Sequence, residues 1–298
     1  MSASTPRPTA EMTYRPPHAL DIGFALLGAK TVRRRSGVYW WTTETPEGGA
    51  VVAFREGSGL VRADGWGPGT DWAFTRLPAL LGADDDPSDF HTEHPVIAPL
   101  VGRFAALRIG STGRWYEALC VAAIGQRVVT ADAGASRAAL ARDFGETAPA
   151  GPSDFFPTPE VLLRITDHEF HRAGIERSRA RVLRVAAKYA DRIERLDTIP
   201  AADATEWLQR LPGIGPWTTA LTTAVAGGDA DAVPVGDLHI PRMVSYALTG
   251  EEGGDAEMLE ALDPYAGHRQ RVVRLVKMGG AGGENHRPRP FRYDISEI

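Results

Sequence analysis

The first third of the chain has the hydrophobic pattern of antiparallel strands. Residues 38–43 form a run of β-branched and aromatic side chains, and a Pro-Glu-Gly-Gly turn at 46–49 separates them from a second apolar run at 50–54. Two such runs around a short glycine-containing turn predict a β-hairpin. Residues 60–63 predict a further strand and residues 75–81 a short helix. We therefore expect a small β-containing unit in this part of the chain.

After residue 90 the apolar positions change to the spacing of helices. We expect helices at 94–104, 115–144 (one or two helices), 159–165, 177–196, 201–210, 216–225, 241–248, 258–261 and 268–277. A Gly-Gly-Ala-Gly-Gly run at 279–283 predicts a flexible linker. The proline-containing basic segment that follows it cannot be helical.

These patterns predict an α+β chain, in which a small N-terminal antiparallel β domain precedes an all-helical domain. We expect a disordered N-terminus at residues 1–13, the β-containing domain at 14–90, the helical domain at 91–278 and a flexible basic tail at 279–298. No internal repeat is apparent.

Composition narrows the function classes. Cys120 is the one cysteine among 298 residues, which excludes an internal disulfide, a four-cysteine zinc site and a four-cysteine iron–sulfur cluster. Its apolar surroundings predict a small buried side chain rather than a reactive thiol. No apolar stretch has the length of a membrane span, and the polar, proline-rich start does not resemble a signal peptide. We expect a cytoplasmic protein without a membrane partner, associated with the nucleoid if bacterial.

The net charge of −5 by itself argues against a nucleic-acid partner. The two signs are segregated, however, so the total is a poor guide. Acidic residues gather at 84–86 and 251–252, whereas basic residues gather at 172–188 and 269–277. A basic surface for DNA therefore remains open, with modest and salt-sensitive affinity.

The most informative motif is Leu-Pro-Gly-Ile-Gly-Pro-Trp-Thr at 211–218. Proline and glycine interrupt one helix there, and Pro216 suits the first position of the next. Glycines allow close approach of a ligand to the backbone, and the free N–H groups at a helix start bind anions. The motif predicts a helix-hairpin-helix that holds a nucleic-acid phosphate.

With Asp237 about twenty residues further on, this motif resembles the helix-hairpin-helix/Gly-Pro-Asp superfamily of DNA glycosylases. The segments at 14–17, 116–126 and 263–269 are similar to further motifs of the 3-methyladenine DNA glycosylase II (AlkA-type) proteins. The resemblance covers about residues 14–278 and is most specific in the helical half. It implies a protein that flips a damaged base out of double-stranded DNA and cleaves its glycosidic bond.

Asp237 stands where the resemblance places the catalytic aspartate. Loss of a base leaves positive charge on the deoxyribose, and a nearby carboxylate stabilises that charge or orients the attacking water. One carboxylate suffices for an alkylated base, because the leaving base is already cationic. Asp237 also fits the N-cap of a helix that begins near Ile240. The two roles are compatible.

Trp217 occupies the position at which the family's bifunctional members carry a lysine that attacks the sugar. Tryptophan offers no amine for a Schiff base, so we expect a monofunctional enzyme. The indole face suits stacking on an electron-poor flipped base. The alternative is a core aromatic that packs the hairpin.

The expected DNA contacts come from the hairpin. Its backbone N–H groups would hold a phosphate and so position the DNA without reading its sequence. The residues assigned to this role are Pro212, Gly213, Ile214, Gly215 and Thr218. The Thr218 hydroxyl could add a contact or bond back within its own helix. The resemblance also permits a structural monovalent cation on the hairpin carbonyls; no other metal or cofactor is expected.

The motif at 116–126 adds three candidates. By resemblance, Tyr116 and Gln126 would contact substrate. Arg127 stands where the AlkA-type pattern has an apolar wedge that fills the space left by the flipped base. An arginine can stack on bases or pair with a phosphate, so Arg127 is assigned to DNA binding, with a solvated surface residue as the alternative.

The function we expect is therefore a monomeric, monofunctional DNA glycosylase of base excision repair that acts on alkylated, 3-methyladenine-like bases. Two alternatives stay open: a glycosylase for oxidised or bulky lesions, and a noncatalytic module that binds damaged DNA.

Overall fold

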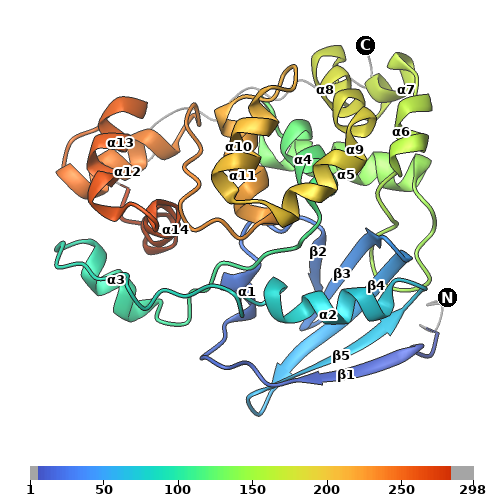
Figure 1. Ribbon diagram of the computed structural model, residues 1–298, viewed down its shortest axis with the longest axis horizontal. Coiled ribbons are helices and arrows are strands. Elements are labelled where there is room, and N and C mark those ends of the chain that lie inside the picture. Colours follow the sequence, from blue (N-terminus) through green and yellow to red (C-terminus); the bar gives the residue numbers. More distant parts are fainter. Residues whose placement is uncertain (1–5, 283–298) are drawn as a thin grey trace.

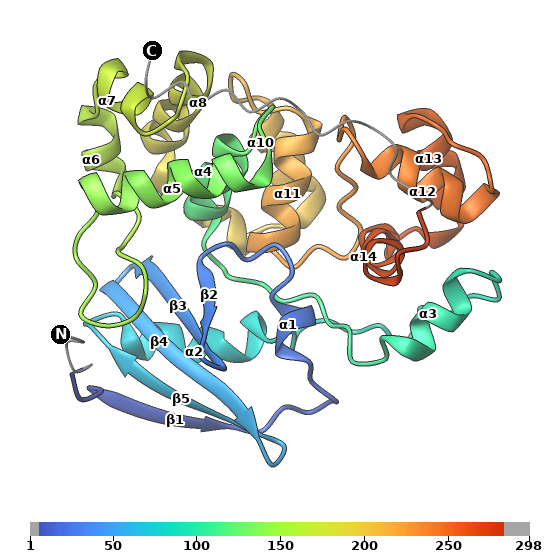
Figure 2. The same ribbon diagram turned by 180° about the vertical axis from the view of Figure 1, so that it is seen from behind.

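The computed structural model describes residues 6–282 of the chain (Figures 1 and 2). Its N-terminal part is a five-stranded antiparallel sheet with the order β1-β5-β4-β3-β2. The strands are β1 (Ala10–Tyr14), β2 (Val32–Arg35), β3 (Val38–Thr45), β4 (Gly48–Gly57) and β5 (Leu60–Trp66). β3 and β4 form the predicted hairpin, and β5 is the predicted third strand.

The expected disorder of residues 1–13 is wrong from Ala10 onward. β1 begins there and pairs with β5 in the register Ala10↔Gly65 to Tyr14↔Val61. The backbone partners of this edge strand lie 47 to 55 residues away along the chain, so its local polar and proline-rich composition gives no sign of them.

Each face of the sheet is covered by a different segment. α2 (Thr70–Leu80) packs on one face, where Trp41, Phe54 and Leu77 are fully buried. The loop that follows α5 covers the other face, with Phe155 packed against Val51. The sheet is therefore a closed hydrophobic unit beneath the helical part.

The remaining helices are α1 (Ile22–Ala25), α3 (Ile97–Arg103), α4 (Trp115–Ile124), α5 (Thr130–Phe144), α6 (Pro159–Arg164), α7 (Asp167–Arg172), α8 (Arg177–Lys188), α9 (Ala190–Glu194), α10 (Ala201–Gln209), α11 (Pro216–Ala226), α12 (Ile240–Thr249), α13 (Asp255–Leu262) and α14 (Arg269–Gly279), with 3₁₀ turns η1 (Arg195–Thr198) and η2 (Asp263–Tyr265). The predicted helix at 115–144 is two helices, and that at 177–196 is divided near Tyr189. α7 was not predicted.

The helices form two groups (Figures 1 and 2). One group, α4 to α10, encloses a core that includes Leu119, Phe170 and Leu183. The other group, α3 with α12 to α14, encloses a second core around Val244, Met258 and Val272. α11 lies between them in both views, and the loop from α11 to α12 joins the groups. This loop carries Asp237.

The described residues contain no helix that is both long and apolar enough to cross a membrane. Cys120 is fully buried in the first helical core, and burial raises the pKa of its thiol well above the ordinary value. This is the buried, inert cysteine that its sequence neighbours predicted. The expected tail at 279–298 lies, from residue 283 onward, outside the described residues.

Candidate active site

The 211–218 motif forms the turn between α10 and α11. Leu211 and Ile214 are buried and anchor the turn in the first helical core, and the Ile214 amide donates to the Leu211 carbonyl at 3.2 Å. Gly213 has a φ of +82°, and a Cβ at this position would lie 2.6 Å from Val182 Cγ2. Both its backbone angle and the close packing of α8 therefore require glycine here.

Gly215 serves a different purpose from Gly213. Its backbone is extended, and a Cβ there would meet no atom within 4 Å. Thr219 donates to the Gly215 carbonyl at 3.0 Å, so the preceding amides of Trp217 and Thr218 belong to the unpaired first turn of α11. Gly215 thus leaves open space at a helix start that can accept an anion.

Trp217 and Asp237 are in direct contact at this end of α11. The indole Nε1–H donates to Asp237 Oδ2 at 2.8 Å, and both side chains are half-buried. The far edge of the indole lies close to the end of α4, because a Cβ on Gly125 would be 3.5 Å from Trp217 Cη2. The structure therefore places the indole between α4 and the carboxylate of Asp237.

Asp237 is also the N-terminal cap of α12. Its Oδ1 accepts from the backbone amides of His239 at 2.9 Å and Ile240 at 3.0 Å. Together with Trp217, three N–H donors fix the orientation of the carboxylate. Asp237 therefore caps α12, as the sequence allowed, through Oδ1, and its other oxygen, Oδ2, faces the Trp217 indole.

Gln126 connects the end of α4 to the hairpin. Its Nε2 donates to the Gly213 carbonyl at 3.0 Å and to Thr218 Oγ1 at 2.9 Å. Arg179 steadies the same end of α4, because its guanidinium donates to the Ile124 carbonyl at 3.0 Å. The side-chain amide of Gln126 thus holds protein backbone, which differs from the substrate contact expected of it.

Arg127 follows directly and adopts a φ of +57°, a strained angle for a non-glycine residue. Its side chain is exposed, and within residues 6–282 it has no hydrogen-bond or ion-pair partner. The turn after α4 therefore presents a free guanidinium close to the hairpin that Gln126 binds.

Two predicted side-chain contacts do not fit the structure. Tyr116 is 5% exposed and packs in the first helical core, so it cannot line an open substrate site. Thr218 is 3% exposed and its hydroxyl accepts from Gln126, so only its backbone remains available to a phosphate. In both cases a family motif identified the helix correctly but could not tell which way the side chain points.

The hairpin carbonyls leave room for the expected monovalent cation. Leu211 O and Gly213 O each accept one hydrogen bond, and a carbonyl oxygen has two lone pairs. The cation stays a prediction. The described residues hold no group of three or more His, Cys, Asp or Glu side chains that could bind a metal.

Leu238 was not singled out by the sequence. It follows Asp237 directly and is 61% exposed, the largest exposed fraction among the large apolar side chains of the described residues. Its exposure depends on the loop from α11 to α12, which has no hydrophobic periodicity to reveal it. Leu238 adds an apolar surface next to the carboxylate.

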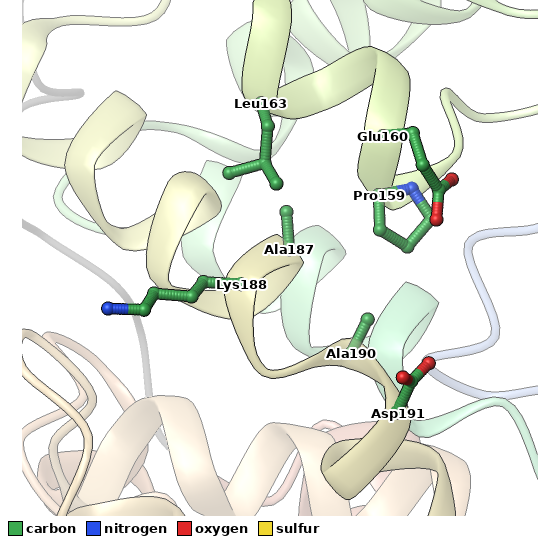
Figure 3. Close-up of a pocket in the computed structure, with 7 residues that line it drawn as sticks. All are labelled: Pro159, Glu160, Leu163, Ala187, Lys188, Ala190 and Asp191. Carbon is green, nitrogen blue, oxygen red and sulfur yellow. The ribbon is translucent and has the colours of Figure 1, made fainter.

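Two surface recesses lie away from this site. One, of about 260 Å³, lies between α6, α8 and α9, with Leu163 and Ala187 at its wall (Figure 3). The other, of about 350 Å³, lies where the C-terminal end of α11 meets the start of α14. Neither is lined by Trp217 or Asp237.

Comparisons with known proteins give the fold. No family model and no curated protein sequence matches the chain. Among solved structures, 3-methyladenine DNA glycosylase from Archaeoglobus fulgidus has a TM-score of 0.73 at 20% identity, covering 89% of this chain and 97% of that one. MBOgg1 in complex with a low-affinity DNA ligand has a TM-score of 0.74 at 17% identity, covering 94% and 100%.

The 8-oxoguanine glycosylase/lyase from Clostridium acetobutylicum, in its apo form, has a TM-score of 0.71 at 14% identity, covering 90% of this chain and 95% of that one. Each similarity spans the sheet and both helical groups. The N-terminal antiparallel sheet and the helical hairpin between α10 and α11 are both present, as the sequence predicted. The chain therefore has the fold of the helix-hairpin-helix/Gly-Pro-Asp DNA glycosylases.

Proposed function

We propose that the protein is a monofunctional DNA glycosylase that releases a damaged base from double-stranded DNA. The observation that carries this proposal is the contact of Trp217 with Asp237 at the hairpin end of α11. A carboxylate fixed by three N–H donors stands beside a helix start suited to a phosphate. This is the combination that cleavage of a glycosidic bond within DNA requires.

The chemistry follows from these positions. A phosphate held at the hairpin would place the adjoining deoxyribose near Asp237. As the bond to the base breaks, positive charge develops on the sugar, and the negative charge of Asp237 lowers the energy of that state. The same carboxylate can orient a water molecule for attack on the sugar. Because the three donors already fix it, little reorganisation accompanies the reaction.

Hydrolysis without strand cleavage is supported by Trp217. A lyase reaction needs an amine that attacks the sugar, and an indole has none. The Trp217 N–H is instead engaged with Asp237. The ring remains suited to stacking on an extruded base, and the free guanidinium of Arg127 suits the space that such a base leaves in the duplex.

For the substrate we propose alkylated bases, the class implied by the AlkA-type motifs. A single carboxylate matches this class, because a cationic base leaves without a second acid to protonate it. Among the similar structures, one is described as a 3-methyladenine glycosylase and another as an 8-oxoguanine glycosylase/lyase. The second activity includes a lyase step for which Trp217 supplies no nucleophile.

The test is a base-release assay. The protein is incubated with duplex DNA that carries a panel of alkylated, oxidised and deaminated bases, and the free bases are identified by mass spectrometry. Release of alkylated bases without strand cleavage supports the proposal. Binding to damaged DNA with no base released from any substrate would instead favour a noncatalytic binding module.

A further inference from the structure

β2 is an open edge of the five-stranded sheet. It comes last in the strand order and, among the described residues, pairs only with β3 (Figures 1 and 2). The Thr42 amide donates to the Thr31 carbonyl at 3.4 Å, and in this antiparallel register the hydrogen bonds to β3 fall on every second residue of β2. The N–H and C=O groups of Arg34 therefore point away from β3. Because Arg34 is exposed, these groups can accept a further strand.

The same edge is strongly basic. Three consecutive arginines, 33–35, fill the last three of the four positions of β2, and Lys30 stands two positions before the strand. Within residues 6–282 none of these four side chains forms an ion pair with a carboxylate, although Arg34 lies over the Tyr39 ring at 5.5 Å from its centroid. Successive side chains of a strand point to opposite faces, so the guanidinium groups flank the open edge on both faces of the sheet.

Further positive charge reaches this edge from α14. Partial desolvation lowers the pKa of Lys30, and the nearby charges of Lys277 and Arg33 lower it further. Since Lys277 belongs to α14, this helix comes close to the start of β2. Charges of one sign at close range destabilise a folded protein unless opposite charge joins them. The edge therefore suits an acidic partner.

The chain that follows α14 contains an acidic segment. The described residues end at Gly282, which packs against Met243 of α12. Residues 294–298 read Asp-Ile-Ser-Glu-Ile, with two β-branched isoleucines and no basic side chain. The chain advances twelve residues from Gly282 to Asp294, which gives a reach of about 40 Å when extended. That reach starts from the end of a helix that already comes close to β2.

We propose that residues 294–298 pair with β2 as a sixth strand of the sheet and set Asp294 and Glu297 against its arginines. These two acidic residues are three positions apart, so in an extended segment their carboxylates point to opposite faces, as the guanidinium groups of β2 do. Opposite charges on paired strands stabilise the pairing, and backbone hydrogen bonds to Arg34 add to it. The added strand covers an edge that other chains could otherwise pair with.

Hydrogen exchange at the Arg34 amide tests this pairing, because that N–H points toward the proposed strand. By nuclear magnetic resonance on the full chain, we expect this amide to exchange roughly tenfold faster in the Asp294→Lys/Glu297→Lys variant than in the unaltered protein. Ile295→Pro/Ser296→Pro keeps both carboxylates and should cause the same loss of protection. Of two consecutive residues in a strand, one N–H faces the neighbouring strand, and proline removes it.

An exchange of charges separates a specific pairing from a general effect of charge. Arg34→Glu/Arg35→Glu should lose the protection at position 34, and combining it with Asp294→Lys/Glu297→Lys should restore most of it. The control is a variant with the same change in net charge at two exposed acidic residues of the described chain, Glu47→Lys/Glu251→Lys. Exchange at position 34 should be unchanged in this control.

Two results would overturn the pairing. One is exchange at position 34 that is equal in the unaltered protein and in the lysine and proline variants of the 294–298 segment. The arginines would then protect the edge without a carboxylate partner. The other is protection that disappears on dilution, because the segment of a second copy would then occupy the edge. Since the assay measures the sheet edge and not base release, its result does not depend on the proposed function.

Discussion

The indole N–H of Trp217 donates to Asp237 Oδ2 at 2.8 Å. The two residues are twenty positions apart in the sequence, and Asp237 lies in the loop that joins the two helical groups. The other oxygen of Asp237 accepts from the amides of His239 and Ile240. A side chain that could have been only a core aromatic thus positions the candidate catalytic carboxylate. This relationship makes separate predictions for the ring and for its N–H group.

Trp217→Phe keeps an aromatic face and removes the N–H donor. A hydrogen bond to a charged group contributes about 1.5–3 kcal/mol, so we expect the single-turnover rate of base release to fall roughly tenfold to a hundredfold. Affinity for DNA that carries an abasic-site analogue should change little, because the backbone N–H groups of the hairpin are unchanged. An unchanged rate would show that Trp217 does not position Asp237.

Trp217→Lys introduces the amine that a lyase needs. Because this amine would stand beside Asp237, we expect the variant to gain a covalent complex with abasic-site DNA that borohydride traps. The unaltered protein should give none, and Trp217→Arg provides a cationic control without a nucleophilic amine. A trapped complex with the unaltered protein would contradict the monofunctional assignment.

Gly213 and Gly215 should respond differently to alanine. Gly213→Ala meets Val182 and an unfavourable φ, so we expect destabilisation of about 1–3 kcal/mol in chemical denaturation. Gly215→Ala has open space and an extended backbone, so its stability should stay within about 0.5 kcal/mol.

For DNA the expectation is reversed, since a methyl group on Gly215 would occupy the place proposed for a phosphate. Gly215→Ala should weaken binding to duplex DNA in a salt-dependent titration although the protein remains folded. If Gly215→Ala bound DNA as the unaltered protein does, the phosphate would not be held at this hairpin.

Glu117 makes stability depend on pH. It is buried on α4 at the junction with the sheet and accepts from Thr43 Oγ1 at 2.8 Å. Burial raises the pKa of Glu117 from 4.5 to about 7, against the opposing effects of Thr43, Arg114 and Arg137. The folded protein therefore keeps the proton up to about pH 7, whereas the unfolded chain loses it near 4.5. Stability attributable to this group falls as pH rises through that window.

Glu117→Gln removes this titration and keeps a hydrogen-bond acceptor for Thr43. Relative to the unaltered protein, the variant should gain about 2–3 kcal/mol in free energy of unfolding between pH 5 and pH 8. Urea denaturation at the two pH values measures the difference, with the exposed Glu251→Gln as control. If the difference in free energy of unfolding between the variant and the unaltered protein were the same at both pH values, Glu117 would not titrate between pH 5 and pH 8 in the folded protein.

Local sequence signals predicted much of the fold. The β3–β4 hairpin and the turn from α10 to α11 are set by nearby glycines, prolines and β-branched residues, and both were located correctly. β1 was missed, because its identity as a strand depends on distant pairing with β5. α7 was also missed, although Thr166 and Glu169 form a capping box at its start.

The site could be predicted in position but only partly in side-chain direction. The spacing from the hairpin to Asp237 identified two elements that the fold joins through Trp217. Gln126 and Thr218 carry polar groups that suit a ligand, yet they bind each other. Arg274 was placed in a basic segment, but its burial, with no hydrogen bond to Nη1 among the described residues, depends on the packing of α14 against distant parts of the chain. Such facts arise from tertiary contacts that have no local signal.

The central claim is that Asp237 carries the chemistry, and Asp237→Asn tests it most directly. Asparagine keeps an acceptor for the α12 amides, replaces the acceptor that faces Trp217 by an NH2 group, and removes the negative charge. In a single-turnover assay on duplex DNA with 7-methylguanine, we predict a loss of base release of at least about a hundredfold, with binding to the same DNA retained. Base release by the folded variant at the rate of the unaltered protein would contradict the account.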